Sequence, residues 1–377
     1  MREQLACDVA VIGGGIMGSA TALFLRRRGL AVTLLERDLC GSRSSGVNFG
    51  GVRRQGRPVA QLPLAQRSHR LWGRLTELIG TEAEYERSGH FKIARSAADM
   101  ASLARYAERG NRHGLGLQLI EGRAALHKHF PMGSGQIVGG SLCPEDGQAN
   151  PRLLSPAFAR AAQAAGADVR EHAPVQSVEH DGTRFVVQAL QHGRALQVRA
   201  PALVNCAGAW AAPFAGQWGE PVPLRTSPPA MGVTEPLPFF LRWSLGVEGG
   251  GIYCRQVRRG NVVFGGGRGY LLDGLRARSS HAAMLAQLPQ LAALLPQLAT
   301  AHVIRTWSGT EGYLPDDQPV LGASARRAGL FHAFGFAGGG FQLGPGVGDV
   351  MAELIAEGRT STPIDSFSIH RFLQAAA

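Results

Sequence analysis

Strand-type and helix-type patterns alternate at the start of the chain. Residues 8–12 form a short apolar run typical of a strand, and residues 19–25 are apolar at helical spacing. Residues 31–35 form a second strand-type run that ends at Glu36. The turn between the first strand and the helix reads Gly13-Gly14-Gly15-Ile16-Met17-Gly18, a G-x-G-x-x-G pattern. The chain therefore begins with a predicted strand, glycine turn, helix and strand.

This order of elements has a chemical meaning. A glycine turn at a helix N-terminus can receive a pyrophosphate, because unpaired backbone N–H groups and the positive end of the helix dipole converge there. An acid about 20 residues later can accept hydrogen bonds from an adenosine ribose. We therefore expect a bound dinucleotide rather than a glycine turn without a ligand.

The rest of the chain predicts a mixture of helices and strands. Helices are expected over 62–78, 97–110, 151–165, 281–294 and 347–357. Pro289 is expected to break or bend the helix over 281–294. Strands are expected as a pair within 84–93, at 167–170, in a meander over 175–187, at 202–206, in a hairpin over 251–265 and at 330–334. The segment between about residues 223 and 267 is hairpin-like, and its sequence pattern differs from that of the first strands. We therefore expect a second, mostly antiparallel domain.

Glycine-rich segments recur far from the N-terminus. One polar and glycine-rich stretch covers residues 40–51, and a second covers residues 335–348 before the last predicted helix. Backbone that must approach a ligand closely often has this composition, and a helix that follows a glycine loop offers another positive dipole end. Two such loops at opposite ends of the chain suit one long cofactor, held at its pyrophosphate and at its redox ring.

Composition narrows the function classes. The chain has 377 residues, enough for two domains, and no apolar run reaches the roughly 20 residues that a membrane span needs. Five scattered cysteines without metal-ligand spacing fit a reducing compartment, and no metal site is expected. We therefore expect a cytoplasmic protein. The formal charge of +11 comes almost entirely from dispersed arginines, so nucleic-acid binding is the less favoured interpretation.

Taken together, these motifs resemble the FAD-dependent oxidoreductases of the D-amino-acid-oxidase and glycine/sarcosine-oxidase superfamily. The resemblance rests on Gly13 to Gly18 with Glu36, the 44–51 loop, residues 204–210, the 307–322 run and residues 335–348. It implies an α/β fold with a doubly wound, Rossmann-like FAD-binding domain and an inserted α+β antiparallel-sheet substrate domain. The expected FAD-binding domain comprises residues 1–80, 141–222 and 300–377, and the substrate domain comprises residues 81–140 and 223–299.

The resemblance also implies which residues contact a non-covalently bound FAD. Gly13, Gly15 and Gly18 would hold the pyrophosphate, Glu36 the adenosine ribose, and Val175 would meet the adenine. The full set of implied cofactor contacts is Gly13, Gly15, Ile16, Met17, Gly18, Glu36, Arg37, Ser44, Ser45, Gly50, Gly51, Val175, Ala207, Gly208, Trp210, Gly338, Gly339, Gly340, Phe341 and Gln342. Cys40 is the nearest candidate for a covalent link, and we do not expect one.

Three residues are candidates for substrate chemistry. Arg255 could bind a substrate carboxylate through two hydrogen bonds, or it could lie on a solvated strand edge. Tyr253 could donate a hydrogen bond to substrate, or it could serve packing alone. Related enzymes often carry an arginine shortly after the Trp-x-Gly motif, whereas this chain has Glu311 there. An acid facing the pocket would favour a cationic or amine group, and the alternative is a structural ion pair.

The expected function is FAD-dependent oxidation of the C–N bond of an amino acid or secondary amine, with hydride transfer to flavin N5 and hydrolysis of the imine product. The Glu311 segment and the glycine loop resemble opine-oxidising and hydroxyproline-oxidising relatives, some of which pass electrons to partner subunits. The first alternative is therefore a dehydrogenase subunit of a heteromeric enzyme that does not use oxygen. A flavoprotein that binds or modifies RNA and a purely NAD-binding dehydrogenase are further alternatives.

Overall fold

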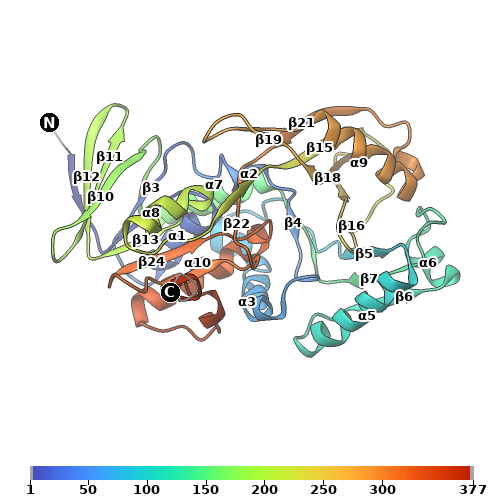
Figure 1. The fold of residues 1–377 in the computed structure, drawn as a ribbon, viewed down its shortest axis with the longest axis horizontal. Coiled ribbons are helices and arrows are strands. Elements are labelled where there is room, and N and C mark those ends of the chain that lie inside the picture. Colours follow the sequence, from blue (N-terminus) through green and yellow to red (C-terminus); the bar gives the residue numbers. More distant parts are fainter. Residues whose placement is uncertain (1–2, 374–377) are drawn as a thin grey trace.

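The computed structural model describes residues 3–373 and is elongated, with two groups of sheets at its ends (Figure 1). A six-stranded sheet has the order β23-β24-β13-β2-β3-β9, and every neighbouring pair is parallel except β23 with β24. Its strands are β2 (Val9–Ile12), β3 (Val32–Leu35), β9 (Asp168–Arg170), β13 (Ala202–Asn205), β23 (Val320–Ala323) and β24 (Leu330–Phe334). The α/β fold expected from the sequence is confirmed.

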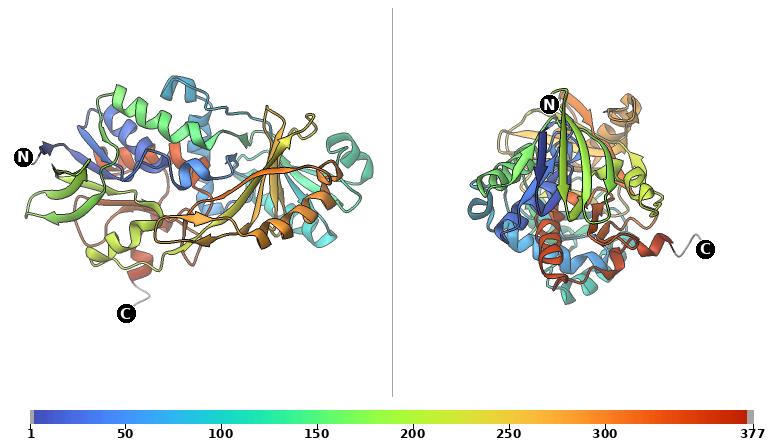
Figure 2. Two further views of the ribbon diagram at one scale, coloured as in Figure 1. Left: turned by 90° about the horizontal axis from the view of Figure 1, so that it is seen from above. Right: turned by 90° about the vertical axis from the view of Figure 1, so that its left-hand side faces the viewer.

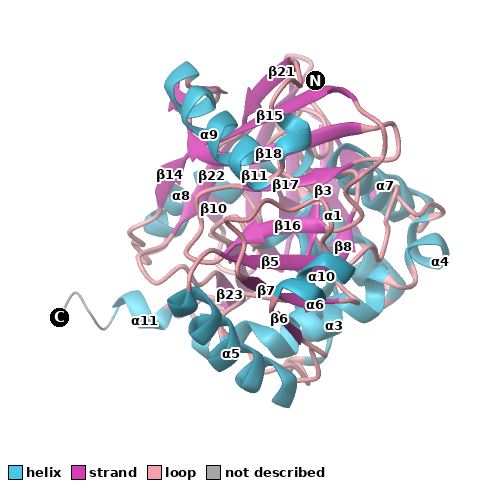
Figure 3. Ribbon diagram, turned by 90° about the vertical axis from the view of Figure 1, so that its right-hand side faces the viewer, coloured by secondary structure: helices cyan, strands magenta, loops and turns pink. Residues whose placement is uncertain are grey.

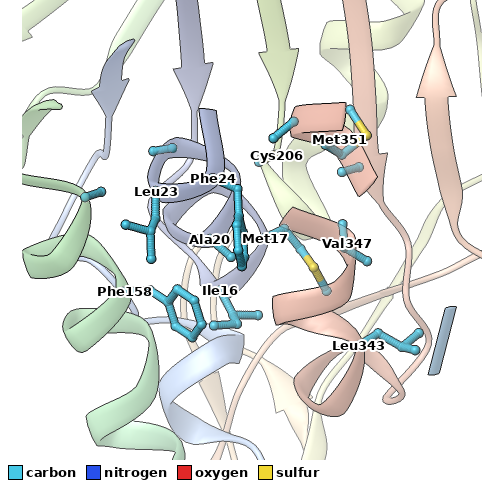
Figure 4. Close-up of a cluster of buried hydrophobic side chains, with 14 of the residues drawn as sticks. Ile16, Met17, Ala20, Leu23, Phe24, Phe158, Cys206, Leu343, Val347 and Met351 are labelled. Carbon is cyan, nitrogen blue, oxygen red and sulfur yellow. The ribbon is translucent and has the colours of Figure 1, made fainter. Parts of the chain in front are cut away.

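Three helices cover one face of this sheet. They are α1 (Ile16–Arg27), α7 (Pro151–Ala164) and α10 (Gly340–Glu357), and α1 lies between the other two. Figure 4 shows Met17 and Ala20 of α1 beside Val347 of α10, with Phe158 of α7 on the other side of α1. Burial of these apolar side chains stabilises the layer. Helix α3 (Leu62–Trp72) packs on the outer side of α10.

A four-stranded sheet covers the opposite face. It has the order β1-β12-β11-β10, and its strands are β1 (Glu3–Ala6), β10 (Val175–His180), β11 (Phe185–Gln191) and β12 (Arg194–Ala200). Side chains such as Phe185 and Val198 form a core with Ala10 and Leu203 of the six-stranded sheet. Helices, a parallel sheet and a second sheet thus form three layers, which Figure 2 shows from above and from the side.

The other end of the molecule is built on an eight-stranded sheet, β21-β15-β18-β17-β16-β5-β7-β6, whose strands follow one another from top to bottom in Figure 3. They are β5 (His90–Ala94), β6 (Gln118–Glu121), β7 (Gly139–Cys143), β15 (Pro229–Pro236), β16 (Ser244–Val247), β17 (Tyr253–Gln256), β18 (Asn261–Arg268) and β21 (Val303–Ser308). Helices α6 (Arg123–His129) and α9 (His281–Leu294) share a core with this sheet, and α5 (Ala97–Arg112) packs against β5, β6 and β7.

The remaining elements are short. They are α2 (Ser44–Val47), α4 (Leu75–Ile79), α8 (Ala211–Gln217), α11 (His370–Leu373), β4 (Gly51–Val52), β8 (Gly147–Gln148), β14 (Arg225–Ser227), β19 (Tyr270–Leu271), β20 (Ala277–Arg278) and β22 (Glu311–Tyr313), with 3₁₀ helices at Val59–Gln61, Gly208–Trp210, Pro296–Leu298 and Asp365–Phe367. No helix among residues 3–373 is long and apolar enough to cross a membrane.

Several elements differ from the sequence expectation. The helix expected over 62–78 is two helices, since α3 is capped by Gly73 and α4 starts again at Leu75. The strand pair expected within 84–93 is the single strand β5, because Ala83 and Glu84 have positive φ angles of 50° and 55° that turn the backbone. Helix α9 continues through Pro289, held by buried residues such as Met284 and Leu291.

The last helix begins earlier than expected. Helix α10 starts at Gly340 and not near Val347, so it includes four glycines, Gly340, Gly344, Gly346 and Gly348. A Cβ on Gly344, Gly346 or Gly348 would collide with Ile16, Ser68 or Ala20 respectively. These glycines therefore allow close packing of α10 on α1 and α3. The division of the chain into an FAD-binding and a substrate domain stays a prediction.

Candidate active site

A cavity of about 350 Å³ opens at the carboxyl ends of β2, β3, β13 and β24. In the sheet, β3 and β9 lie on one side of β2, and β13 and β24 lie on the other side. The chain therefore reverses its direction of winding beside β2. Ligands of doubly wound sheets bind at this kind of topological switch point. Residues from both ends of the chain line the cavity, from Ile12 to Phe341.

The N-terminus of α1 forms one wall. Gly13, Gly15, Ile16 and Met17 line the cavity, and Gly13 has a φ of 103° at a place where a Cβ would collide with the Cys206 carbonyl. Ser45 Oγ accepts a hydrogen bond of 2.9 Å from the Ile16 N–H. The glycine turn therefore fits closely against the chain that follows strand β13, and the N-terminus of α1 borders the cavity.

Glu36 lies at the end of β3 and lines the same wall. Its carboxylate accepts hydrogen bonds from Gly14 N–H at 2.6 Å and from Asp38 N–H at 2.8 Å. Burial raises the pKa of Glu36, while these two hydrogen bonds oppose the shift. A carboxylate has about four acceptor positions, so Glu36 retains capacity for ligand hydroxyls.

The neighbouring end of the cavity is formed by Val175, Pro174, Arg37 and Trp210. The Arg37 guanidinium lies 4.5 Å from the centre of the Trp210 ring. The Trp210 indole N–H donates to the Gly274 carbonyl at 2.6 Å, and the Arg43 guanidinium donates to the Leu275 carbonyl at 3.0 Å. The tip of the β19–β20 hairpin is therefore tied to two residues that line the cavity.

Glu311 also lines the cavity, and its Oε2 lies beside Gly338, 3.5 Å from where a Cβ on that glycine would be. Glu311 Oε2 accepts a 2.8 Å hydrogen bond from the Tyr313 hydroxyl, and the Arg268 guanidinium lies 5.3 Å from the centre of the Tyr313 ring. Burial raises the pKa of Glu311, and the bond from Tyr313 opposes this. A carboxyl group thus faces the cavity where the C-terminal glycine loop ends.

Most of the residues expected at the cofactor come together in this cavity. Those that line it are Gly13, Gly15, Ile16, Met17, Glu36, Arg37, Ser44, Ser45, Val175, Ala207, Gly208, Trp210, Gly338, Gly340 and Phe341. Their roles towards a cofactor stay predictions, but their common location is a property of the fold.

The other expected residues lie outside the lining. Gly18 packs against the Gly13 carbonyl, and Gly51 pairs with Gln148 in a two-stranded ribbon. Gly50 packs against Ala149 and Arg255. The buried Gln342 side chain donates to the Ala65 carbonyl at 2.9 Å. Gly339 accepts a hydrogen bond from Arg57.

Tyr253 and Arg255 alternate with the buried Cys254 on β17, so their side chains share one face of the strand. The Tyr253 ring lies 4.7 Å from that of Phe49, and Arg255 Nε donates to the Phe49 carbonyl at 2.6 Å. Arg255 is only 6% exposed and β17 lies between β16 and β18, so the solvated-edge interpretation was wrong. Burial lowers the pKa of Arg255 to about 10.

Cys40 is a poor candidate for a covalent link. It is buried, does not line the cavity, and its pKa is raised by burial and by the nearby Glu171 and Glu36 carboxylates. A protonated thiol is a weak nucleophile. Among residues 3–373 there is no cluster of three or more His, Cys, Asp or Glu side chains that could hold a metal ion.

Sequence reasoning missed several residues of this site. Arg43 and Asn48 line the cavity, and Tyr313 holds Glu311. The sequence did contain a signal for Tyr313, because it is two residues after Glu311 and residues two apart on a strand share a face. Arg57, which contacts the C-terminal glycine loop, had none, because its burial follows from packing between distant segments.

Comparisons with known proteins agree with this geometry. Residues 8–354 match the model of the family described as FAD dependent oxidoreductase. The chain is 27% identical to glycine oxidase of Geobacillus kaustophilus and 26% identical to one of the opine oxidase subunits of Rhizobium meliloti, over 97% of both chains in each case. It covers only 43% and 41% of two longer mitochondrial relatives.

The fold has a counterpart among solved structures. The L-proline dehydrogenase from P. horikoshii superposes with a TM-score of 0.90 at 25% identity, over 100% of this chain and 99% of that one. Glycine oxidase, opine oxidase and this dehydrogenase are oxidoreductases that act on amines and amino acids. This chain belongs to the family of FAD-dependent oxidoreductases that includes the amino-acid and amine oxidases.

Proposed function

We propose that FAD occupies the cavity with its pyrophosphate at the N-terminus of α1 and its flavin ring beside Gly338, Gly340 and Glu311. The observation that carries this proposal is the single cavity lined by both glycine loops. Its polar groups fit FAD: the N-terminus of α1 for the phosphates, and the Glu36 carboxylate as an acceptor for the ribose hydroxyls. Val175 and Pro174 would flank the adenine.

The proposed reaction is oxidation of the C–N bond of a small amine or amino acid. Bound FAD would supply the hydride acceptor, and the imine product would hydrolyse in water. The protein contributes orientation and exclusion of water. We assign to Glu311 the recognition of a cationic or amine group of the substrate, and to Tyr313 the orientation of the Glu311 carboxyl.

Tyr253 and Arg255 do not line the cavity, but both contact Phe49, the residue after the cavity-lining Asn48. Through Phe49, Arg255 holds the 48–50 loop, and Gln148 Oε1 accepts from Arg255 at 3.3 Å. This makes Arg255 a positioning residue for the loop, while a direct bond to a substrate carboxylate stays a prediction. Tyr253, half-buried against Phe49, is the better placed of the two to meet a substrate.

A second candidate function is supported by the names of the relatives. The opine oxidase and sarcosine oxidase relatives of Rhizobium meliloti are named as subunits of their enzymes, and the P. horikoshii protein is a dehydrogenase. This chain could by the same logic be a catalytic subunit that passes electrons to a partner protein instead of oxygen. Cytoplasmic location and the RNA-binding alternative stay untested predictions.

Anaerobic mixing of the FAD-loaded protein with a panel of amines tests the proposal. The panel contains D- and L-amino acids, sarcosine, hydroxyprolines and opines, and the readout is bleaching of the visible flavin absorbance. Bleaching by one class supports C–N oxidation and identifies the substrate group. Recolouring on admission of air supports an oxidase, whereas a flavin that stays bleached in air supports the dehydrogenase subunit. A bound flavin that no amine bleaches contradicts the proposal.

A further inference from the structure

Arg57 is a buried cation that has no acidic partner among residues 3–373. It is 4% exposed, and its guanidinium donates to three neutral oxygens: the Arg53 carbonyl at 3.0 Å, Gln61 Oε1 at 3.2 Å and the Gly339 carbonyl at 2.7 Å. Buried charges are normally paired, because removal from water without a counter-ion is costly. A buried arginine without a carboxylate counter-ion is therefore unusual.

The nearest acid is already engaged elsewhere. The Asp146 carboxylate accepts from Arg54 Nε at 3.0 Å and from the backbone N–H groups of Arg54 and Gln55. Arg53 adds a like charge beside Arg57. Burial, together with Arg53, lowers the pKa of Arg57 to about 9, and the attraction of Asp146 only partly opposes this. Asp146 therefore attracts Arg57 but forms no ion pair with it, because its carboxylate is engaged by Arg54 and Gln55.

Arg57 lies behind the loop at the start of helix α10. Its bond to Gly339 places the guanidinium directly behind the loop that opens α10, an 18-residue helix that starts at Gly340. Gly338 and Gly340, on either side of Gly339, line the cavity, whereas Arg57 does not. The positive end of the α10 dipole and the Arg57 charge thus lie together behind one wall of the cavity.

We propose that Arg57 is a positioning residue that adds an uncompensated positive charge behind the Gly338–Gly340 wall and so stabilises the anionic form of the flavin. This inference rests on the proposed function, which places the pyrimidine edge of the flavin at this wall. Arg57 acts through the loop: it fixes the Gly339 carbonyl and supplies the missing counter-charge for an anion on the cavity side.

The charge balance of the reaction explains why such a residue is useful. A neutral amine that loses a hydride, one proton with two electrons, becomes a cationic iminium. The neutral oxidised flavin that accepts the hydride becomes a reduced flavin of charge minus one. A fixed positive charge near the pyrimidine favours that product and costs no rearrangement during the reaction.

The test compares charge removal, charge retention and charge neutralisation at this position. Arg57→Met removes the charge, and Arg57→Lys keeps it. Gln61→Glu places a carboxylate where Gln61 Oε1 now accepts from Arg57, which neutralises the charge while the bond to Gly339 remains. Arg109→Met, on the exposed face of α5, is the control for loss of a remote cation.

Two readouts need no substrate. The first is the reduction potential of the bound flavin, titrated with a chemical reductant. The second is the dissociation constant of sulfite, which bonds to the oxidised flavin with its own electron pair and leaves a negative charge on the ring. We expect Arg57→Met and Gln61→Glu to lower the potential and to weaken sulfite binding about tenfold. That is the size expected for a unit charge at about 10 Å in an effective dielectric constant of about 20.

Arg57→Lys and Arg109→Met should keep both values close to those of the unchanged protein. The inference is overturned if Arg57→Lys lowers the potential and weakens sulfite binding as much as Arg57→Met does. It is also overturned if Gln61→Glu changes neither value. Either result would mean that the role of Arg57 is structural. Should Arg57→Met fail to fold, Gln61→Glu decides alone. Because neither readout uses an amine, shifts in these variants would support the inference even if no amine reduced the flavin, which would contradict only the proposed function.

Discussion

At the scale of single residues, we propose that Glu311 selects the substrates that the site accepts. Its carboxyl lines the cavity and accepts a hydrogen bond from the Tyr313 hydroxyl. Because burial raises its pKa above the usual range, the group loses its charge as the pH falls through that raised value. We expect kcat/KM for a cationic substrate to fall on the acid side for this reason.

Glu311→Gln should remove that acid limb and lower kcat/KM for cationic substrates by about tenfold or more, since one charge-assisted hydrogen bond is lost. The measurement is the pH profile of kcat/KM for wild type and variant, with a neutral amine as the comparison substrate. An unchanged acid limb in Glu311→Gln would show that another group causes it.

A second residue-scale prediction concerns Asp146, which is fully buried and holds both the side chain and the backbone of Arg54. Removal of one partner of a buried ion pair typically costs about 3–5 kcal/mol. Asp146→Asn should lower the free energy of unfolding in urea by that order. The neighbouring Glu145 forms an exposed pair with Arg87, so Glu145→Gln should cost less than about 1 kcal/mol. Equal effects of the two substitutions would contradict this account.

Residue identities were predictable where a motif carries local information. The glycine turn, Glu36 and Glu311 were found from the sequence because spacing or position in a motif marks them. The burial of the Arg54, Arg57 and Arg255 side chains was not predictable, because segments far away in the chain cover each of them. Burial of an arginine leaves no periodic signal in its own segment.

At the scale of elements, the C-terminal glycine segment has two separate tasks. Its first part, up to Gly340, borders the cavity, while Gly344, Gly346 and Gly348 let α10 pack closely on α1 and α3. The sequence suggested one long ligand-binding loop, because glycines that serve close helix packing look the same as glycines that serve a ligand. Strands and helices with clear periodicity were predicted well, and the breaks at Gly73 and Glu84 were missed.

Helix packing at Gly348 can be tested directly. A Cβ there would lie 2.5 Å from Ala20 Cβ, so Gly348→Ala should lower the free energy of unfolding by about 1–3 kcal/mol through overpacking. Gly216 in α8 has open space around its Cβ position, so Gly216→Ala should be neutral or slightly stabilising. Denaturant unfolding of both variants checks this, and a neutral Gly348→Ala would refute the packing role.

At the scale of the whole molecule, the two ends are joined at two residues that line the cavity. The β19–β20 hairpin extends from the eight-stranded sheet, and its tip accepts hydrogen bonds from Trp210 and Arg43 beside the six-stranded sheet. Such long-range closure could not be predicted from local patterns, although the order of the motifs indicated that distant segments meet. The doubly wound sheet itself was predictable from its first strand-turn-helix-strand unit.

Loss of this tie should speed the release of FAD. Trp210→Phe removes one hydrogen bond to the hairpin tip, so the dissociation rate of FAD should rise about fivefold, as expected for a neutral hydrogen bond. Trp218→Phe is the control, because the Trp218 indole N–H has no acceptor among residues 3–373. The recovery of FAD fluorescence after dilution measures both rates. Identical rates would show that the hairpin does not retain the cofactor.

The central claim is that this chain uses FAD to oxidise the C–N bond of an amine. The most direct measurement is an anaerobic single turnover in which the carbonyl product is counted against the flavin reduced. We expect one carbonyl product for each flavin bleached by the substrate amine. Flavin that is bleached by a nicotinamide cofactor but by no amine, or bleaching without a carbonyl product, would contradict it.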